Sequence, residues 1–269
     1  MPDIRIARDP EALARQAAAG FVDLADKAIR DKGSFNVSLS GGSTPKALYS
    51  LLASAENCER VKWSRVRFFF GDERNVPADD EKSNYRMARE ALFEPLQINE
   101  SNVINWITEL GSPQHVAEMY DLAIQMAFDA KLDPARNVSD DDTEAVNDDP
   151  PFQENILPRF DLVLLGLGTD GHTASLFPHT KALNDNNRLA AENWVPQMGE
   201  FRFTMTFPLI NNAANVMFLV SGGDKAVMVR EVVSGEYRPD DLPAQRVDPA
   251  NGELIWLIDE PAAALLDVK

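Results

Sequence analysis

The sequence predicts an α/β protein with a mostly parallel, Rossmann-like sheet and helices on both faces of that sheet. Short apolar runs alternate with amphipathic helical segments along the chain, which is the order of elements found in parallel sheets. Two of these runs, at residues 162–165 and 215–220, are almost entirely apolar, as expected of strands buried on both faces. Several runs end in glycine and polar residues, and the carboxyl ends of the strands are where such sheets bind ligands.

The composition narrows the class of protein. We expect residues 1–269 to form a single α/β domain, with two smaller domains as the alternative. The formal net charge of −17 disfavours nucleic acid as a partner, because nucleic-acid binding depends on Lys and Arg that neutralise phosphates. No stretch is long and apolar enough to span a membrane, and the amino terminus lacks a secretory signal pattern. The one cysteine, Cys58, cannot form an internal disulfide and fits the reducing cytoplasm.

In the first half of the chain, helices and strands are expected to alternate. Residues 9–31 carry apolar side chains at near-3.6 spacing, with Asp9 as N-cap, Pro10 in the first turn and Gly33 just past the end. The same reasoning predicts strands at 35–40, 65–70 and 102–106, and helices at 45–54, 83–96 and 113–130. Met119 is expected on the inward face of the last of these helices.

The second half continues the alternation after an acidic segment. Residues 137–151 carry six acids and no apolar period, so they predict a mobile loop insertion; calcium binding is a weak alternative, because an EF-hand needs another spacing and a glycine. Beyond this loop, strands are predicted at 162–165, 188–195, 201–207, 215–220 and 254–258, with a turn at 208–212, a helix at 226–235 and a short helix at the carboxyl end.

The strand at 162–165 runs into the stretch with the most distinctive chemistry. Gly166, Gly168 and Gly171 allow close approach of a ligand, and Asp170 and His172 are an acid and an imidazole suited to proton transfer. The three glycines also satisfy the dinucleotide-binding pattern, but that pattern needs a long helix, and a proline follows too soon for one to form. The three histidines and single cysteine do not have the spacing of a metal site, so we expect no metal.

A second junction, after the strand at 35–40, predicts an anion site. Gly41, Gly42, Ser43 and Thr44 precede a helix begun by Pro45, so that free N–H groups, the helix dipole and two hydroxyl groups face the same point. The alternative is an ordinary helix start capped by Ser43 or Thr44. The ATP-type P-loop is excluded, because no Gly-Lys-Ser/Thr follows at the required spacing.

Three further charged groups lie near other strand ends. Asp72 is a second carboxylate candidate and Arg74 a fixed cation for a phosphate or an oxyanion, with a surface salt-bridge cluster as the alternative. Lys225 lies at another strand–helix junction, where cations are unusual unless they bind an anion, and Arg202 is a further candidate cation. If the sheet is parallel, the four segments that follow these strands, at residues 41–44, 71–74, 166–172 and 221–225, lie at the same edge of the sheet.

These residues together resemble the 6-phosphogluconolactonases, within the wider superfamily that includes glucosamine-6-phosphate deaminases. The resemblance spans about four fifths of the chain and is carried by matching segments in family order: Ser40-Gly41-Gly42-Ser43-Thr44-Pro45, Gly71-Asp72-Glu73-Arg74 with Val76-Pro77, Ser83-Asn84-Tyr85, the run from Gly166 to Pro178, and Gly222-x-x-Lys225-Ala226.

The resemblance implies hydrolysis of 6-phospho-glucono-1,5-lactone to 6-phosphogluconate in the oxidative pentose phosphate pathway, without a cofactor. It implies that His172 is the general base on water, or passes that proton to the ring oxygen, and that Asp170 orients it. Arg74 and Asp72 would line the sugar, with Arg74 facing the oxyanion. The phosphate would be held by the loop N–H groups with Ser43, Thr44, Arg202 and Lys225.

Two other functions of this fold are weighed against the lactonase. As the resemblance has it, deaminases follow Asp-Gly-His with Asn-Glu-Pro, whereas this chain has Ser175-Leu176-Phe177-Pro178 and lacks that carboxylate. A non-catalytic sugar-phosphate sensor would need a DNA- or partner-binding segment, and no basic helix-turn-helix pattern is present in the sequence. We therefore expect a cytoplasmic lactonase with a small sugar-phosphate substrate, active as a monomer or small homo-oligomer.

Overall fold

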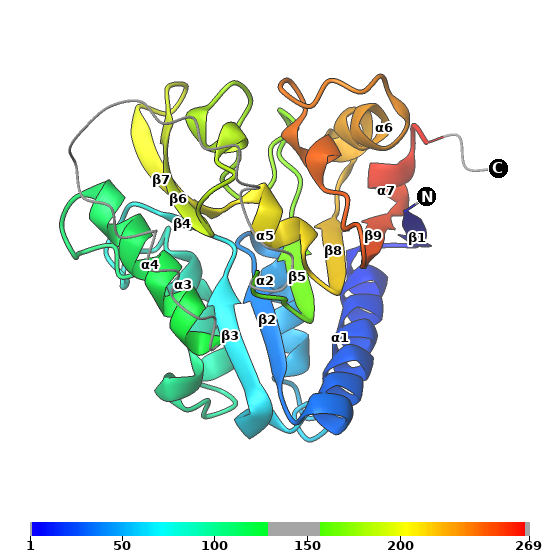
Figure 1. Ribbon diagram of the computed structural model, residues 1–269. Helices are drawn as coiled ribbons and strands as arrows, with labels where there is room; N and C mark the ends of the chain where they lie inside the picture. Colours follow the sequence, from blue (N-terminus) through cyan, green and yellow to red (C-terminus); the bar gives the residue numbers. More distant parts are fainter. Residues whose placement is uncertain (1, 129–156, 267–269) are drawn as a thin grey trace.

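The computed structural model describes residues 2–128 and 157–266 of the chain (Figure 1). The predicted acidic loop at 137–151 and the last residues of the helix predicted at 113–130 therefore lie outside the described residues. None of the described helices has the length and apolar content that crossing a membrane requires.

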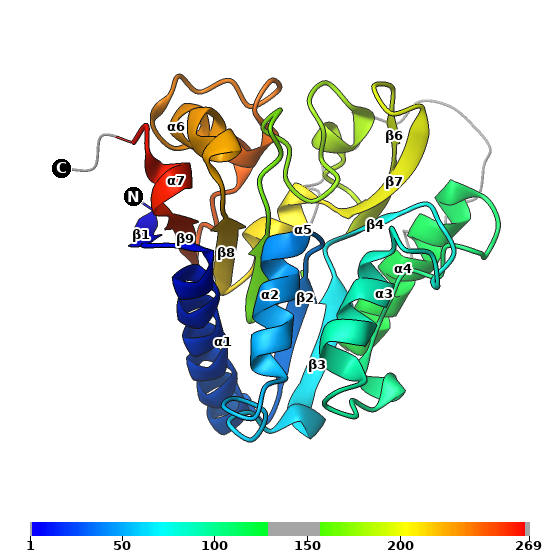
Figure 2. The same ribbon diagram turned by 180° about the vertical axis from the view of Figure 1, so that it is seen from behind.

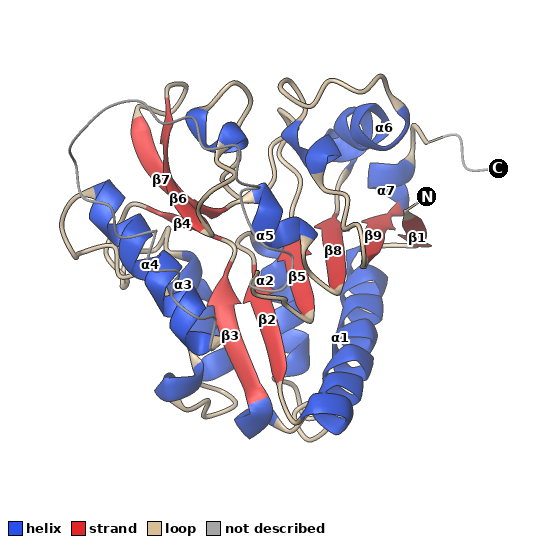
Figure 3. Cartoon of the chain, viewed as in Figure 1, coloured by secondary structure: helices blue, strands red, loops and turns tan. Residues whose placement is uncertain are grey.

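The main sheet of the described residues has six strands in the order β1-β9-β8-β5-β2-β3, and all of its pairs are parallel (Figure 3). The prediction of a mostly parallel sheet is confirmed. Because β8, β5, β2 and β3 are neighbours, the segments that follow them emerge along one edge of the sheet. The strands are β1 (Asp3–Ala7), β2 (Phe35–Leu39), β3 (Val66–Phe70), β5 (Leu162–Leu165), β8 (Asn215–Val220) and β9 (Glu253–Asp259).

Helices cover both faces of this sheet. Helices α2 and α3 lie in front of it in Figure 2, whereas α4 and α5 lie in front of it in Figure 1. The predicted caps of the first helix are confirmed, since Asp9 accepts a hydrogen bond from the N–H of Ala12 and Gly33 adopts a φ of 82° at the other end. The helices are α1 (Pro10–Lys32), α2 (Ser43–Leu52), α3 (Asn84–Ala88), α4 (Pro113–Ala127), α5 (Phe207–Asn211), α6 (Ala226–Ser234) and α7 (Glu260–Ala263).

A second, smaller sheet is antiparallel and stands beside the main one. Its order is β4-β7-β6, formed by β4 (Asp72–Arg74), β6 (Ala190–Val195) and β7 (Glu200–Met205). The chain passes from the first sheet to the second at Gly71, whose N–H donates to the carbonyl of Leu39 (2.9 Å) and whose carbonyl accepts from the N–H of Met205 (2.7 Å). The strands predicted at 188–195 and 201–207 exist, but they belong to this separate sheet.

Several local predictions were wrong. Residues 102–106 form only one bridge, between Val103 and Phe68, and not a strand. The helix predicted at 83–96 is α3 followed by a π-helical turn at Arg89–Phe93, and the turn predicted at 208–212 lies mostly within α5. Met119, predicted to face inward, is 39% exposed. The described residues also contain short 3-10 turns, at Trp63–Arg65, Glu100–Asn102, Lys181–Asn184, Gly223–Lys225 and Pro243–Arg246.

Candidate active site

His172 and Asp170 form a close pair in the loop that follows β5. The Nδ1 atom of His172 lies 2.5 Å from Oδ1 of Asp170, and the same oxygen accepts the backbone N–H of His172 at 3.2 Å. Partial burial disfavours the charged form of Asp170, but the hydrogen bond and the charge of His172 outweigh it, so the pKa of Asp170 lies below its ordinary value. A carboxylate engaging Nδ1 leaves Nε2 as the nitrogen that can exchange a proton with a bound molecule.

The imidazole ring of His172 is enclosed on two sides. Phe177 stacks on it, with ring centroids 4.1 Å apart and an interplanar angle of 28°. Gly168 lies against it as well, because a Cβ added at this glycine would be 2.1 Å from Nδ1 of His172 and 2.6 Å from Oδ1 of Asp170. The N–H of Gly168 also donates to the carbonyl of His172 at 2.8 Å. From the sequence, Gly168 was expected to allow close approach of a ligand; in the structure its missing side chain makes room for the His172–Asp170 pair.

The rest of this loop contradicts the dinucleotide alternative. Gly171 has a φ of 83° and its carbonyl accepts the N–H of Ala244, so it forms a turn and does not open a helix. The next helical residues are the short 3-10 turn at Lys181–Asn184. Ala174 is held at a φ of 48°, inside a turn that the N–H of Leu176 closes onto the carbonyl of Thr173 at 3.0 Å.

The predicted anion site lies at the start of α2, after β2. Gly42 is the N-cap residue with a φ of 104°, and no side chain caps this helix end. The alternative in which Ser43 or Thr44 acts as the cap is therefore wrong. Gly42 and Ser43 are exposed and Thr44 is half-buried, so the first-turn amides and both hydroxyl groups remain available to an anion.

A chain of hydrogen bonds joins this helix start to the His172 loop. A Cβ at Gly41 would lie 1.9 Å from Oδ1 of Asn84, so only glycine fits there. The Nδ2 atom of Asn84 donates to the carbonyl of Asp72 (3.0 Å) and to its Oδ1 (3.3 Å). The other carboxylate oxygen of Asp72 accepts from the hydroxyl of Ser175 at 2.8 Å. Asp72, 9% exposed, thus connects both parts of the site, and Asn84 is its partner. The sequence offered Ser83 or Asn84 as the cap of this helix; Ser83 is the cap.

The neighbouring acid, Glu73, has a structural role that the sequence reading also missed. Its carboxylate accepts the N–H groups of Asn84 (2.8 Å) and Tyr85 (2.9 Å), in the first turn of α3. Burial raises the pKa of Glu73, and hydrogen bonds from these backbone amides oppose the shift. Glu73 therefore fixes α3, which in turn places Asn84.

Two predicted cations lie opposite each other in the second sheet. Arg74 on β4 is the register partner of Arg202 on β7. Arg74 donates to the carbonyl of Lys82 at 2.5 Å, whereas Arg202 forms an ion pair with Glu200 at 2.6 Å. Burial, with the charge of Arg74, lowers the pKa of Arg202. The surface salt-bridge alternative for residues 72–74 does not hold among the described residues, because Asp72 and Arg74 bind neutral groups there.

Lys225 is placed at the same edge of the sheet by β8. It ends the 3-10 turn Gly223–Lys225 directly before α6, and its side chain is 23% exposed. Its Nζ lies 3.9 Å from Asp224, a long ion pair. The loop before it is anchored by buried Asp259, which accepts from the hydroxyl of Ser221 (2.5 Å) and the N–H of Gly222 (3.1 Å). The predicted convergence of four strand ends on one edge is confirmed by the strand order.

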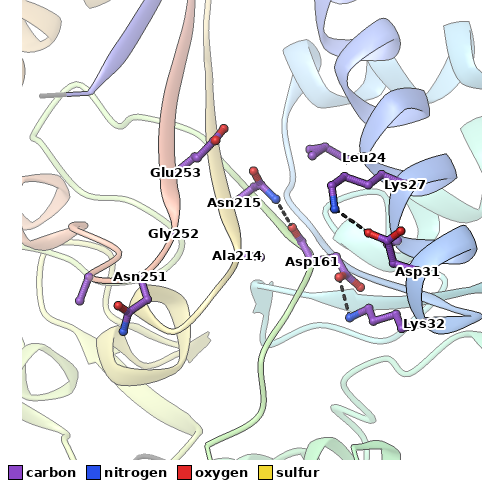
Figure 4. A pocket seen from close by; sticks show the side chains of 12 residues that line it. Leu24, Lys27, Asp31, Lys32, Asp161, Ala214, Asn215, Asn251, Gly252 and Glu253 are labelled. Carbon is purple, nitrogen blue, oxygen red and sulfur yellow. Dashed lines mark hydrogen bonds and ion pairs between the residues drawn. The ribbon is translucent and has the colours of Figure 1, made fainter.

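A hollow of about 590 Å³ lies away from these residues, at the opposite edge of the sheet (Figure 4). Its lysines are neutralised by carboxylates, since Lys32 pairs with Asp161 and Lys27 with Asp31, each at 2.6 Å. It lies where the strands begin, whereas parallel sheets bind ligands where the strands end. In residues 2–128 and 157–266, no group of three His, Cys, Asp or Glu side chains could hold a metal ion.

Comparisons with known proteins identify the family of this chain. The family model described as glucosamine-6-phosphate isomerases/6-phosphogluconolactonase matches residues 8–256. The chain is 36% identical to a 6-phosphogluconolactonase of Synechocystis sp., over 97% of each chain, and 34% identical to one of Nostoc sp., over 98% of each. Among solved structures, the 6-phosphogluconolactonase from Trypanosoma cruzi superposes with a TM-score of 0.81 at 29% identity, covering 100% of this chain and 98% of that one.

Proposed function

Because the chain belongs to the glucosamine-6-phosphate isomerase/6-phosphogluconolactonase family, we propose that it hydrolyses 6-phospho-D-glucono-1,5-lactone to 6-phosphogluconate, in the oxidative pentose phosphate pathway. The observation that carries this proposal is the His172–Asp170 pair, with its 2.5 Å contact, at the carboxyl end of β5. The curated relatives that match nearly the whole chain are lactonases, which favours hydrolysis over deamination.

In the proposed mechanism the phosphate is bound first, and by several elements. The uncapped start of α2, with the hydroxyl groups of Ser43 and Thr44, supplies neutral donors and the positive end of the helix dipole. Arg202 and Lys225 supply full charges, which a dianion needs in a protein whose net charge is −17. Binding at this end fixes the distance from the phosphate to the reacting carbonyl.

Hydrolysis then requires one proton to be moved twice. The Nε2 atom of His172 takes a proton from water as the water oxygen attacks C1 of the lactone, and Asp170 stabilises the resulting imidazolium. Arg74 faces the negative charge that develops on the carbonyl oxygen. The bond between C1 and the ring oxygen then breaks, and the ring oxygen receives the proton from His172. No cofactor takes part in these steps.

A coupled assay on freshly generated 6-phosphogluconolactone tests this function directly. We expect the purified protein to accelerate the appearance of 6-phosphogluconate well above the spontaneous rate. The assay measures reduction of NADP⁺ by 6-phosphogluconate dehydrogenase, at several enzyme concentrations. Rates that do not rise with enzyme, in a protein that still binds inorganic phosphate, would reject the lactonase and favour the role of a sugar-phosphate sensor.

Replacing Lys225 with Ala is expected to raise KM about 10- to 100-fold while changing kcat much less, because a charged hydrogen bond to phosphate contributes about 1.5–3 kcal/mol. The measurement is steady-state kinetics on the same lactone. Lys27→Ala is the charge-matched control, since Lys27 lies at the opposite edge of the sheet and pairs with Asp31. A fall in kcat at constant KM would instead assign Lys225 to the chemical step.

The remaining features of this proposal concern the setting of the enzyme. The single cysteine Cys58 suits a reducing compartment, and we propose the cytoplasm as the site of action. We further propose one α/β domain that acts as a monomer or small homo-oligomer, with the sugar phosphate as its only required small-molecule partner.

A further inference from the structure

The pairing of Arg74 with Arg202 is unusual for a β-sheet. The two residues are direct register partners on the antiparallel strands β4 and β7, so both side chains leave the sheet on the same face. Like charges in directly opposite positions destabilise a sheet. An arrangement of this kind is favourable when an anion lies between or beside the two guanidinium groups.

The carboxylate of Glu200 lies beside one of these two guanidinium groups, that of Arg202. Glu200 precedes Arg202 by two residues on β7, so the two side chains share a face, and its Oε1 lies 2.6 Å from Nη2 of Arg202. The same Nη2 contacts the sulfur of Met198 at 3.4 Å. The side chain of Arg202 is only 15% exposed, whereas that of Glu200 is 44% exposed. The arginine is therefore held in place, while its carboxylate partner can turn into water at little cost.

This face of the second sheet borders the candidate active site. Asp72, two residues before Arg74, accepts a hydrogen bond from the hydroxyl of Ser175 in the His172 loop. Asn193, the register partner of Arg202 on β6, donates to the carbonyl of the same Ser175 at 2.9 Å. Asp72 and Asn193, which neighbour the arginine pair in the sheet, thus both contact the loop that carries His172.

We propose that Glu200 occupies the position at Arg202 that the substrate phosphate takes, and that it acts as a specificity-determining residue by competing with weaker anions. This inference rests on the proposed function, which assigns the phosphate to Arg202. A phosphate dianion can bind a guanidinium through two parallel hydrogen bonds and displaces the carboxylate. A monoanionic carboxylate or a neutral sugar gains too little from Arg202 to do so, and is rejected.

The test is the affinity of inorganic phosphate, measured by isothermal titration calorimetry, which needs no catalytic turnover. We expect Glu200→Gln to tighten phosphate binding about three- to tenfold, because a competing charge is removed. Glu253→Gln removes one negative charge at the opposite edge of the sheet and should leave the affinity unchanged. In an Arg202→Ala background, Glu200→Gln should have no effect, since there is no longer a cation to compete for.

The outcomes separate this inference from the proposed function. Unchanged or weaker phosphate binding in Glu200→Gln, with lactone hydrolysis present in the wild-type protein, overturns the proposal that Glu200 competes with phosphate. The proposed lactonase activity is then retained. Tighter binding that persists in the Arg202→Ala background also overturns it, because the effect is then long-range charge alone. Tighter binding that depends on Arg202, in a protein without lactonase activity, supports the competition and rejects the proposed reaction.

Discussion

Replacing His172 with Ala is expected to lower kcat by about 10²–10⁴-fold, because the proton transfers assigned to its Nε2 contribute that much in comparable enzymes. KM should change little, since the phosphate is bound by other elements. The measurement is the coupled lactonase assay with the spontaneous rate subtracted. Because the lactone also opens in water unaided, the variant must be assayed at high enzyme concentration to quantify the residual rate.

The control for this variant is His179→Ala, a second histidine in the same loop. The His179 side chain is 67% exposed and its Nε2 lies 3.1 Å from Asp241, so its removal should leave kcat close to that of the wild-type protein. Circular dichroism of both variants checks that the fold is retained. If His172→Ala keeps a kcat within a few-fold of the wild-type value, His172 is not the general base.

Replacing Gly168 with Ala is expected to lower kcat by about 10²-fold or more, although Gly168 itself carries no reactive group. Its new Cβ would lie 2.1 Å from Nδ1 and 2.3 Å from Cε1 of His172, distances at which the imidazole must move. Displacement of a catalytic group by about 1 Å can cost on the order of 10²-fold. The contact with Asp170 would break at the same time, because the Cβ would be 2.6 Å from its Oδ1. The measurement is kcat in the same assay.

Gly166→Ala is the matched control, two residues earlier in the same loop. A Cβ at Gly166 meets no atom within 4 Å, and its backbone does not need a positive φ. We expect this variant to keep most of its activity, so that any loss in Gly168→Ala reports the clash with His172 and not a general stiffening of the loop. Equal activity of the two alanine variants would show that the imidazole can work from a shifted position.

The strands that could be predicted from sequence are those whose burial is visible in their composition. Residues 162–165 and 215–220 are apolar on both faces because helices cover the sheet on both sides, and they became β5 and β8. Strand β1, Asp3–Ala7, was missed because it is an edge strand with charged, exposed side chains. The strand predicted at residues 102–106 was wrong, because Trp106 is buried by stacking on Tyr120 and not by pairing of its backbone with a neighbouring strand.

The residues of the candidate site also fall into those that could be predicted from the sequence and those that could not. His172, Asp170 and the start of α2 could be found because glycine, charge and strand ends coincide in the sequence. The need for glycine at position 168 could not be predicted from the sequence, because it arises from the position of the His172 imidazole ring in the folded protein. Asn84 was visible in the sequence only as part of the matching segment Ser83-Asn84-Tyr85, and Glu200 carried no signal at all. Their contacts depend on partners brought together by the second sheet, and the register of that sheet is not encoded in local periodicity.

The Gly71 peptide has a mechanical consequence for the proposed reaction. Its N–H belongs to the hydrogen bonding of the parallel sheet and its carbonyl to that of the antiparallel sheet, so the two sheets meet with no linker between them. The φ and ψ angles of Gly71 lie between these two hydrogen bonds, so they set the direction in which β4 leaves the parallel sheet. A rotation about either angle would carry Asp72 and Arg74 together relative to the end of β3, because both residues follow Gly71 on β4.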